Sequence, residues 1–537
     1  EYDERGNVIS KINAQDNATT ITYDVNDNPL IRTDAQGNKT NFSYDAKGNV
    51  ELITDALTYT TSFTYDPNGL PLTITDARSN TTSNTYDIEG NLEQVKDALN
   101  QVTSFSYDGV GRRLSKTDAL TRSTVYSYDD NNNLLTITDP AAKVITYAYD
   151  ENNNRVSSTD RNNNTTTFSY DEKDLLTTTT DPLTNTVVNG YDALDRRTTL
   201  KDKNANTTQY HYDGIGNLIK VIDALTNEAK FTYDPNGNRL STTDPLNHSA
   251  ELTYDQLNRR IATRNALGNS TQTVYDEVGR VIATSNAKHQ TTSFEYDVLG
   301  RLLKVTDANN GIVNYGYDEN GNRISMQEPN SNITTYEYDV LNRLSKKVEP
   351  LGNMTQYSYD TVGNLQQLIK PNGTVIQYSY NELDRLNTIT YPDNSTVSFV
   401  YDANGNRLQM LDSLGTQSYS YDKLNRMLSH SDPFGNTVGY GYDANGNRTT
   451  LIYPSNNTVT YGYDALNRMA TVTDWLAHTT TYNYDVASRL ISTINPNGTT
   501  ADYSYDKGNR LTSLINAKSD TSVISSYVYT LDKIYQA

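Results

Sequence analysis

The sequence predicts an all-β protein, built as one continuous antiparallel sheet of about 25 hairpin repeats that coils into a hollow spiral shell or tube. Three observations predict this fold class. A tyrosine recurs every 21 residues from Tyr2 to Tyr401. Two short stretches in each interval alternate apolar and polar residues, which is the pattern of strands. Clusters of Asp, Asn, Gly and Pro separate these stretches and predict turns.

The tyrosine series defines the repeat and covers almost the whole chain. Of its 26 tyrosines, 24 are followed by Asp. The tyrosines that we take as structural site residues are Tyr44, Tyr65, Tyr107, Tyr212, Tyr233, Tyr296, Tyr401 and Tyr442. Because the repeat leaves no boundary in composition, we expect residues 1–537 to form a single repeat region, part of a longer polypeptide.

Composition excludes several classes of protein. The chain of 537 residues is 35% hydrophobic, and its 43 tyrosines far outnumber its 8 phenylalanines, which is a poor supply for a dry core. A net charge of −20 opposes nucleic-acid binding, since phosphate contacts need a basic stripe. Cysteine is absent, so the sequence has no disulfide framework and no thiolate nucleophile. No apolar run is long enough to predict a membrane span.

The two stretches of each repeat predict the two strands of a hairpin. In the repeat that begins at Tyr212, Ile219 and Val221 share one face, and Lys220 points the other way. In the second stretch Phe231 and Tyr233 share a face with Ala229. Each repeat therefore forms a hairpin with one aromatic face.

Two kinds of turn are expected between the strands. The first is Tyr-Asp-x-x-Gly-Asn, in which Asp accepts backbone N–H bonds and Gly adopts the left-handed conformation. The second is of the Thr-Asp-Ala/Pro-x-x-Asn type, as in 117–119, 138–140 and 243–247. The turn residues that we single out are Asp45, Gly48, Asp213, Gly216, Asp234, Gly237, Asp402 and Gly405.

Successive hairpins should pair into a ribbon of about 50 strands, on the order of 240 Å along the hydrogen-bonding direction. A flat sheet of that size is implausible because strands twist, so the ribbon should coil. A dry interior would favour Phe, Leu and Ile. Tyrosine carries a hydroxyl that needs a partner, so we expect a wet or partly filled lumen.

Two interruptions of the period carry their own predictions. Tyr421 follows Tyr401 by 20 residues, and Tyr529 follows Tyr505 by 24. A loss within a strand would turn side chains to the wrong face, so we expect the loss in the second turn near 412–416. We expect the gain of three residues to lengthen the turn near 516–521.

Other residue types give no catalytic, cofactor or metal site. The five histidines, which are His211, His248, His289, His430 and His478, have no metal-ligand spacing. Asp and Asn clusters such as 129–133 lack the patterns of calcium-binding loops, so we interpret them as residues that cap turns. The Asn-x-Thr/Ser triplets arise from the repeat itself. Trp475, the only tryptophan, lies in a second turn. Because this turn position tolerates different residue types, we interpret Trp475 as a single chance substitution and not as a residue that contacts a sugar.

The recurring Tyr-Asp-x-x-Gly-Asn/Arg-Leu core resembles the YD repeat of Rhs proteins, with close copies at 44–49, 233–240, 401–408 and 442–448. That family includes bacterial polymorphic toxins, the C subunits of insecticidal toxin complexes, wall-associated proteins and the YD shell of teneurins. The resemblance implies a spiralling β-sheet that forms a hollow shell. In the toxin members the shell encloses a C-terminal effector.

The chain departs from the toxin pattern in one respect. Asp432-Pro433-Phe434-Gly435-Asn436 is superficially similar to the self-cleavage motif of the toxins, but it lies in register as a second turn and lacks the leading motif. We assign it no protease role.

The leading hypothesis is a structural scaffold, not an enzyme, in a large secreted or cell-surface protein of the Rhs type. Two alternatives remain: an open tubular stalk or extracellular filament, and an adhesin that holds glycans on its tyrosines. The corresponding partners are an enclosed effector from the same longer polypeptide, further copies in a fibre, or glycans.

Overall fold

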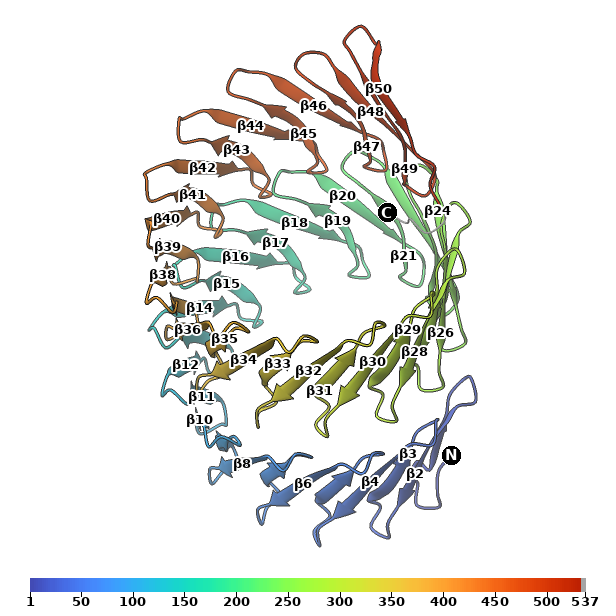
Figure 1. Ribbon diagram of the computed structural model, residues 1–537, viewed down its shortest axis with the longest axis vertical. Coiled ribbons are helices and arrows are strands. Elements are labelled where there is room, and N and C mark those ends of the chain that lie inside the picture. Colours follow the sequence, from blue (N-terminus) through green and yellow to red (C-terminus); the bar gives the residue numbers. More distant parts are fainter. Residues whose placement is uncertain (533–537) are drawn as a thin grey trace.

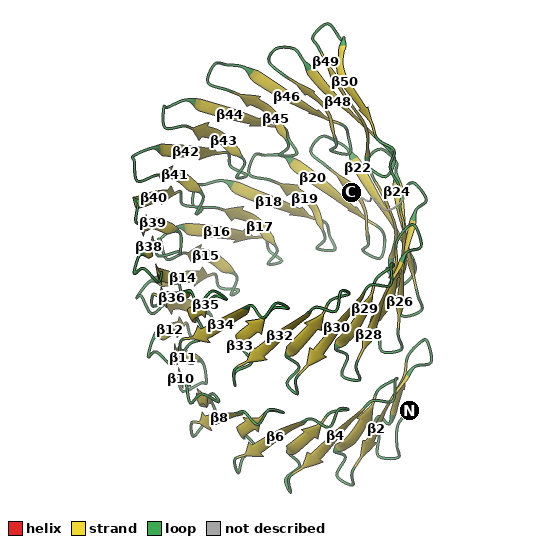
Figure 2. Cartoon of the chain, in the orientation of Figure 1, coloured by secondary structure: helices red, strands yellow, loops and turns green. Residues whose placement is uncertain are grey.

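The computed structural model describes residues 1–532, and these form one 50-stranded sheet in which each strand pairs antiparallel with its neighbours in the sequence (Figure 1). Strands and loops account for all of the described chain in Figure 2. No helix in this range is long and apolar enough to cross a lipid bilayer. The predicted all-β fold class is confirmed.

Each repeat contributes one odd-numbered and one even-numbered strand. The odd-numbered strands, mostly of five residues, are β1 (Ser10–Ile12), β3 (Pro29–Thr33), β5 (Val50–Thr54), β7 (Pro71–Thr75), β9 (Leu92–Lys96), β11 (Arg113–Thr117), β13 (Leu134–Thr138), β15 (Arg155–Thr159), β17 (Leu176–Thr180), β19 (Arg197–Lys201), β21 (Leu218–Ile222), β23 (Arg239–Thr243), β25 (Arg260–Arg264), β27 (Val281–Ser285), β29 (Leu302–Thr306), β31 (Arg323–Gln327), β33 (Leu344–Val348), β35 (Leu365–Ile369), β37 (Leu386–Thr390), β39 (Arg407–Asp412), β41 (Met427–Ser431), β43 (Arg448–Ile452), β45 (Met469–Thr473), β47 (Leu490–Ile494) and β49 (Leu511–Ala517).

The even-numbered strands, mostly of six residues, end at the repeat tyrosine, except for the last of them. They are β2 (Ala18–Tyr23), β4 (Lys39–Tyr44), β6 (Thr60–Tyr65), β8 (Thr81–Tyr86), β10 (Val102–Tyr107), β12 (Ser123–Tyr128), β14 (Val144–Tyr149), β16 (Thr165–Tyr170), β18 (Thr186–Tyr191), β20 (Thr207–Tyr212), β22 (Glu228–Tyr233), β24 (Ser249–Tyr254), β26 (Ser270–Tyr275), β28 (Thr291–Tyr296), β30 (Ile312–Tyr317), β32 (Ile333–Tyr338), β34 (Met354–Tyr359), β36 (Val375–Tyr380), β38 (Thr396–Tyr401), β40 (Gly415–Tyr421), β42 (Thr437–Tyr442), β44 (Thr458–Tyr463), β46 (Thr479–Tyr484), β48 (Thr500–Tyr505) and β50 (Val523–Val528).

A β-bulge interrupts the ladder at the repeat tyrosine, and the sequence pattern did not predict it. Between β20 and β21, Tyr212 pairs with Leu218 while His211 pairs with Lys220, which leaves Ile219 as the extra residue. The same shift recurs at Tyr233, and at the equivalent tyrosine of the other pairs from β2–β3 to β48–β49. Because a bulge bends its strand and increases the local twist, one bulge per repeat gives the ribbon a regular curvature.

The ribbon coils, so that its later half lies along its earlier half. In Figure 1, strands β30 to β34 follow the same arc as β4 to β8 one level away. Hydrogen bonds join residues about one coil apart, such as Gln15 to Asp255 and Asn320 to Asp76, which are 240 and 244 residues apart. With a period of 21 residues, these contacts correspond to about 12 repeats in each turn of the coil.

The coil exposes far more surface than a compact protein of the same mass. Its accessible surface is 29871 Å², whereas a compact protein of this size exposes about 19,000 Å². In the described chain, the only buried hydrophobic residues are Ala287, Ile376, Val459 and Ala517, which are 5–8% exposed. The sheet is therefore a single layer with solvent on both faces, and hydrogen-bonded ladders rather than a dry core hold it together.

The structure accommodates the two interruptions of the 21-residue period in different ways. The one-residue loss lies in the second turn, as predicted: Asp412 pairs with Gly415 across a two-residue loop. The prediction for the three-residue gain is wrong. The turn at 518–522 keeps five residues, β49 is lengthened to seven, and the register shifts between Asn516 and Ala517. Two extra residues preserve the alternation of faces, and a bulge absorbs the third.

Candidate functional site

The repeat tyrosines join consecutive repeats through their hydroxyl groups. The Tyr233 hydroxyl donates to the main-chain carbonyl of Leu218 at 2.9 Å. Leu218 lies beyond the β21–β22 ladder, which starts at Lys220, because the bulge displaces the start of the strand. The hydroxyl therefore supplies a donor to a carbonyl outside this ladder, and phenylalanine could not do so.

All eight tyrosines singled out from the sequence make this bond to the residue 15 positions earlier, at 2.7–3.0 Å. The pairs are Tyr44 to Pro29, Tyr65 to Val50, Tyr107 to Leu92, Tyr212 to Arg197, Tyr233 to Leu218, Tyr296 to Val281, Tyr401 to Leu386 and Tyr442 to Met427. Burial raises the pKa of Tyr65 and of Tyr442, which keeps these hydroxyls protonated as donors at neutral pH. The partner that each of the eight hydroxyls needs is thus a backbone carbonyl.

Replacing Tyr233→Phe is expected to lower the free energy of unfolding by about 1 kcal/mol, because one hydrogen bond is lost while the ring remains. Urea unfolding followed by circular dichroism measures the change. The matched control is Tyr2→Phe, since the Tyr2 side chain is 70% exposed at the start of the sheet. Equal effects at the two positions would contradict a role for the Tyr233 hydroxyl.

The turn aspartates organise the loops between strands. The Asp45 carboxylate accepts the N–H of Lys47 at 2.8 Å, and the N–H and side-chain amide of Asn49 at 2.9 Å each. The amide and the N–H of Asn49 hold the pKa of Asp45 below its ordinary value of 3.8. Asp213, Asp234 and Asp402 accept the same set of bonds from the residue four positions later.

The two kinds of turn expected from the sequence share one geometry. In the first kind, the Asp45 N–H donates to the carbonyl of Asn49, and the Gly48 N–H donates to the carbonyl of Asp45. In the second kind, Asp55, Thr58 and Tyr59 make the same two bonds. The fourth residue has a positive φ in both kinds, so the distinction in sequence does not extend to the backbone.

Glycine is the fourth residue in the four turns that we singled out. The φ angles of Gly48, Gly216, Gly237 and Gly405 are 88°, 98°, 83° and 98°. Threonine occupies the equivalent position at Thr226, with a φ of 68°. A β-branched residue is unfavourable there, because its Cβ crowds the neighbouring carbonyl in the left-handed region.

Replacing Thr226→Asn is therefore expected to stabilise the protein by about 1 kcal/mol or less, since asparagine tolerates the left-handed region better. The reverse change in the next turn of the same kind, Asn247→Thr, should destabilise it by a similar amount, because Asn247 has a φ of 64°. Thermal unfolding of the two variants measures both signs. A stabilising effect of Asn247→Thr would contradict the interpretation.

Arginine at the fifth turn position links one repeat to the next. Arg259 bonds the Asp255 carboxylate at 2.7 Å and the carbonyl of Asp276 at 3.2 Å, and its guanidinium lies 4.6 Å from the centre of the Tyr275 ring. Six further arginines form an ion pair with the aspartate of their own turn and place the guanidinium over the tyrosine ring of the next repeat. They are Arg280, Arg301, Arg343, Arg426, Arg468 and Arg489. Such stacked ion pairs favour arginine over lysine.

The edges of successive coils meet at a seam. Turns that follow odd-numbered strands of the first coil meet turns that follow even-numbered strands of the second coil. Arg122 bonds the carboxylate of Asp118 in its own turn and that of Asp384 across the seam, at 2.6 and 2.9 Å. Arg78 lies 3.5 Å from Asp318 in the same way. Polar side chains at turn tips thus join strands that are far apart in the sequence.

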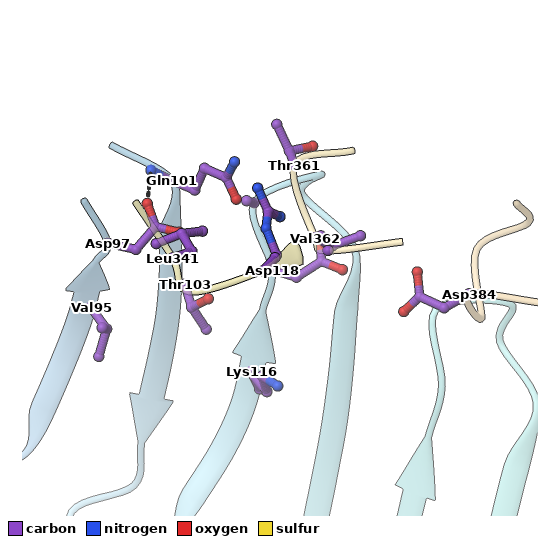
Figure 3. Close-up of a pocket in the computed structure, with 13 residues that line it drawn as sticks. Val95, Asp97, Gln101, Thr103, Lys116, Asp118, Leu341, Thr361, Val362 and Asp384 are labelled. Atoms are coloured by element: carbon purple, nitrogen blue, oxygen red, sulfur yellow. Dashed lines mark hydrogen bonds between the residues drawn. The ribbon is translucent and has the colours of Figure 1, made fainter. Parts of the chain in front are cut away.

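A groove of about 360 Å³ lies along this seam (Figure 3). Asp97 and Asp118 line it from the first coil, and Leu341, Val362 and Asp384 line it from the second. In the described part of the chain, no group of three His, Asp or Glu side chains could hold a metal ion. The groove has mixed polar and apolar walls.

The histidines and the tryptophan occupy separate local settings. His248 and His478 lie 3.3 and 3.1 Å from the aspartates of their own turns. The ring of His430 stacks on Tyr419 at 4.8 Å. Trp475 is half-exposed and contacts Tyr453 edge to face, with ring centres 5.7 Å apart. The structure does not bring these residues together.

Known families match the chain along most of its length. The RHS repeat model matches residues 2–39, 44–81, 86–123, 107–144, 128–164, 149–186, 275–312, 317–354 and 484–521, which together exceed half of the chain. The teneurin YD-shell model matches residues 189–266 and 345–474. A comparison with curated proteins finds no match.

Solved structures share the fold at low sequence identity. The crystal structure of TcdB2–TccC3 without its hypervariable C-terminal region superimposes with a TM-score of 0.69, and that of TcdB2–TccC3–Cdc42 with 0.67. Identity is 14% in both cases, over 96% of this chain and 36% of the other. The chain thus spans about a third of the length of these proteins, and the likeness concerns the coiled sheet.

Proposed function

Since this chain belongs to the RHS-repeat family, we propose that it is the wall of a hollow β-shell that encloses a C-terminal effector carried by the same longer polypeptide. The role is structural: the sheet surrounds and isolates its cargo and performs no chemistry. We further propose that the protein is secreted or held at the cell surface, as in the toxin and teneurin members that the sequence resembles.

The observation that supports this function most is the seam. A coiled ribbon leaves a helical gap in its wall unless successive coils touch. Here hydrogen bonds and ion pairs join one coil to the next, from Gln15–Asp255 to Lys288–Asp532. About 24 strands at about 4.8 Å give a circumference of about 115 Å and, for a round coil, a diameter of about 37 Å. Such a space accommodates a polypeptide, and the contacts between coils would hold the wall around it.

Limited proteolysis of the full-length protein tests the proposal. The effector segment should resist a protease while the coil is intact, and it should become sensitive once the coil is opened by denaturant. Electron microscopy of the same sample should give closed particles of uniform size. An effector segment that is cut equally fast in the intact protein would overturn the enclosing role.

The same experiments address the two alternatives that the sequence left open. Long filaments in the micrographs would favour a tubular stalk or fibre. Binding to a glycan array that is lost when exposed aromatic residues such as Trp475 are replaced would favour an adhesin. A blank array together with closed particles supports the shell.

A further inference from the structure

The tips of the five-residue turns carry a pattern along the seam. We use "third residue" for the residue two positions after the start of a turn. Leu99 is the third residue of turn 97–101 in the first coil, and Leu341, 242 positions later, is the third residue of turn 339–343 in the second coil. Both turns line the seam groove. Third residues 242 positions apart, or 241 beyond the one-residue loss, therefore face each other across the seam.

Where both third residues are asparagine, the bonds are reciprocal. The Asn162 amide donates to the Asp402 carboxylate at 2.9 Å, and the Asn404 amide donates back to the Asp160 carboxylate at 2.7 Å. A second such pair is formed by Asn204 with Asp443 at 2.9 Å and Asn445 with Asp202 at 2.8 Å. Each asparagine thus satisfies an aspartate of the opposite coil.

Where one third residue is apolar, the facing residue is apolar or small in eight pairs and glutamine in two. The close approach is explicit at Gly508, where an added Cβ would lie 2.7 Å from the Leu267 side chain. The facing pairs of this kind are Leu57 with Leu299, Leu99 with Leu341, Leu120 with Val362, Ala141 with Leu383, Leu183 with Leu424, Leu225 with Leu466, Leu246 with Ala487 and Leu267 with Gly508.

The agreement in polarity between facing third residues depends on the register of one coil on the next. In the observed register, 11 of the 13 facing pairs agree in polarity, the exceptions being Gln15 with Leu257 and Gln36 with Val278. Sliding one coil by one repeat in either direction leaves only 4 or 5 of 12 pairs in agreement. A mispaired leucine would face an amide or a guanidinium that then lacks a partner, which is unfavourable.

The free edges carry a different set of third residues, although their turns have the same backbone. Along the free edge of the first coil, nine of twelve are polar or charged, namely Arg5, Asn26, Lys47, Asn68, Glu89, Asn131, Asn152, Lys173 and Asn236. The turns that follow even-numbered strands in the second coil carry mostly leucine and valine at this position. Most apolar third residues therefore lie along the seam, whichever type of turn carries them.

We propose that the third turn residues are the specificity determinants that set the register of one coil on the next, about 12 repeats later. Local turn chemistry is the same throughout and carries no register information. The matched residues at the turn tips supply it. This inference concerns the wall alone and holds whatever the coil encloses.

A double-mutant cycle at one asparagine pair tests the proposal. Asn162→Leu and Asn404→Leu should each destabilise the protein, and the double variant should recover stability because it recreates a Leu–Leu pair. The coupling should change the unfolding equilibrium constant by about threefold or more. The same cycle with Asn131→Leu and Asn372→Leu, third residues on the two free edges, should show no coupling. Additive effects at 162 and 404 would overturn the proposal.

Cross-linking gives a second readout that does not depend on stability. The chain has no cysteine, so two introduced cysteines can be cross-linked only to each other within one chain. A short bis-maleimide should join Leu99→Cys to Leu341→Cys and should leave Leu99→Cys unlinked to Asn320→Cys, which lies one repeat away. Exchanging leucine for asparagine along several third positions of one coil should shift cross-linking toward the second pair. An unchanged pattern would show that other contacts set the register.

Discussion

Acidification below about pH 4 is expected to unfold the coil, because its turns depend on ionised aspartates. Side-chain and backbone hydrogen bonds from the residue four positions later hold the pKa of Asp45, Asp213 and Asp234 below the ordinary 3.8. Their contribution to stability is complete above pH 3.8 and is lost as the pH falls through the depressed folded-state values. The same loss in many repeats should give a steep transition.

Circular dichroism and Trp475 fluorescence between pH 7 and pH 2 at constant ionic strength measure this transition. Replacing Asp213→Asn and Asp234→Asn removes two of the titrating groups but keeps an acceptor oxygen, as in the natural turn that starts with Asn265, where the side-chain oxygen accepts two N–H bonds. This variant should lose less stability between pH 5 and pH 2. A transition centred above pH 5 would instead indicate histidine, and full stability at pH 2 would contradict the role of the carboxylates.

Deletion of a single strand residue is expected to have the largest effect among local changes. Removing Lys230 from the middle of β22 turns one half of the strand over, so that Phe231 and Tyr233 cannot share a face with Ala229. The bond from the Tyr233 hydroxyl to Leu218 would be lost with it. The expected cost is about 3 kcal/mol, from about 1 for the hydrogen bond and about 2 for the Phe231 surface.

The natural short repeat provides a matched control for this deletion. Replacing the turn 223–227 by the four residues found at 412–415, Asp-Ser-Leu-Gly, also shortens the repeat by one residue. It leaves both strands in phase, because the loss lies in the turn, as it does between β39 and β40. Urea unfolding should place this variant within about 1 kcal/mol of the parent. Equal losses for the two deletions would mean that repeat length, and not strand phase, controls stability.

Much of the local structure could be predicted from the sequence, because strand alternation and turn chemistry depend on neighbours. The positions of strands, the left-handed Gly48 and the location of the one-residue loss follow from such rules. The three-residue gain could not be placed, since a strand can absorb two residues without changing its faces, and a bulge can absorb one. The bulge at each tyrosine gives no signal in the alternation of residues, because it adds a residue without moving the periodic tyrosine.

The sequence by itself determined the all-β hairpin repeat, its period and the need for a hydroxyl partner at each tyrosine. Only the tertiary structure decided that the partner is a carbonyl 15 residues back and that turns about 240 residues apart meet. The physical reason is that curvature accumulates: about 24 strands must each turn by about 15° before one coil reaches the next. A small change in that angle would bring different residues together, so no local pattern could identify the seam.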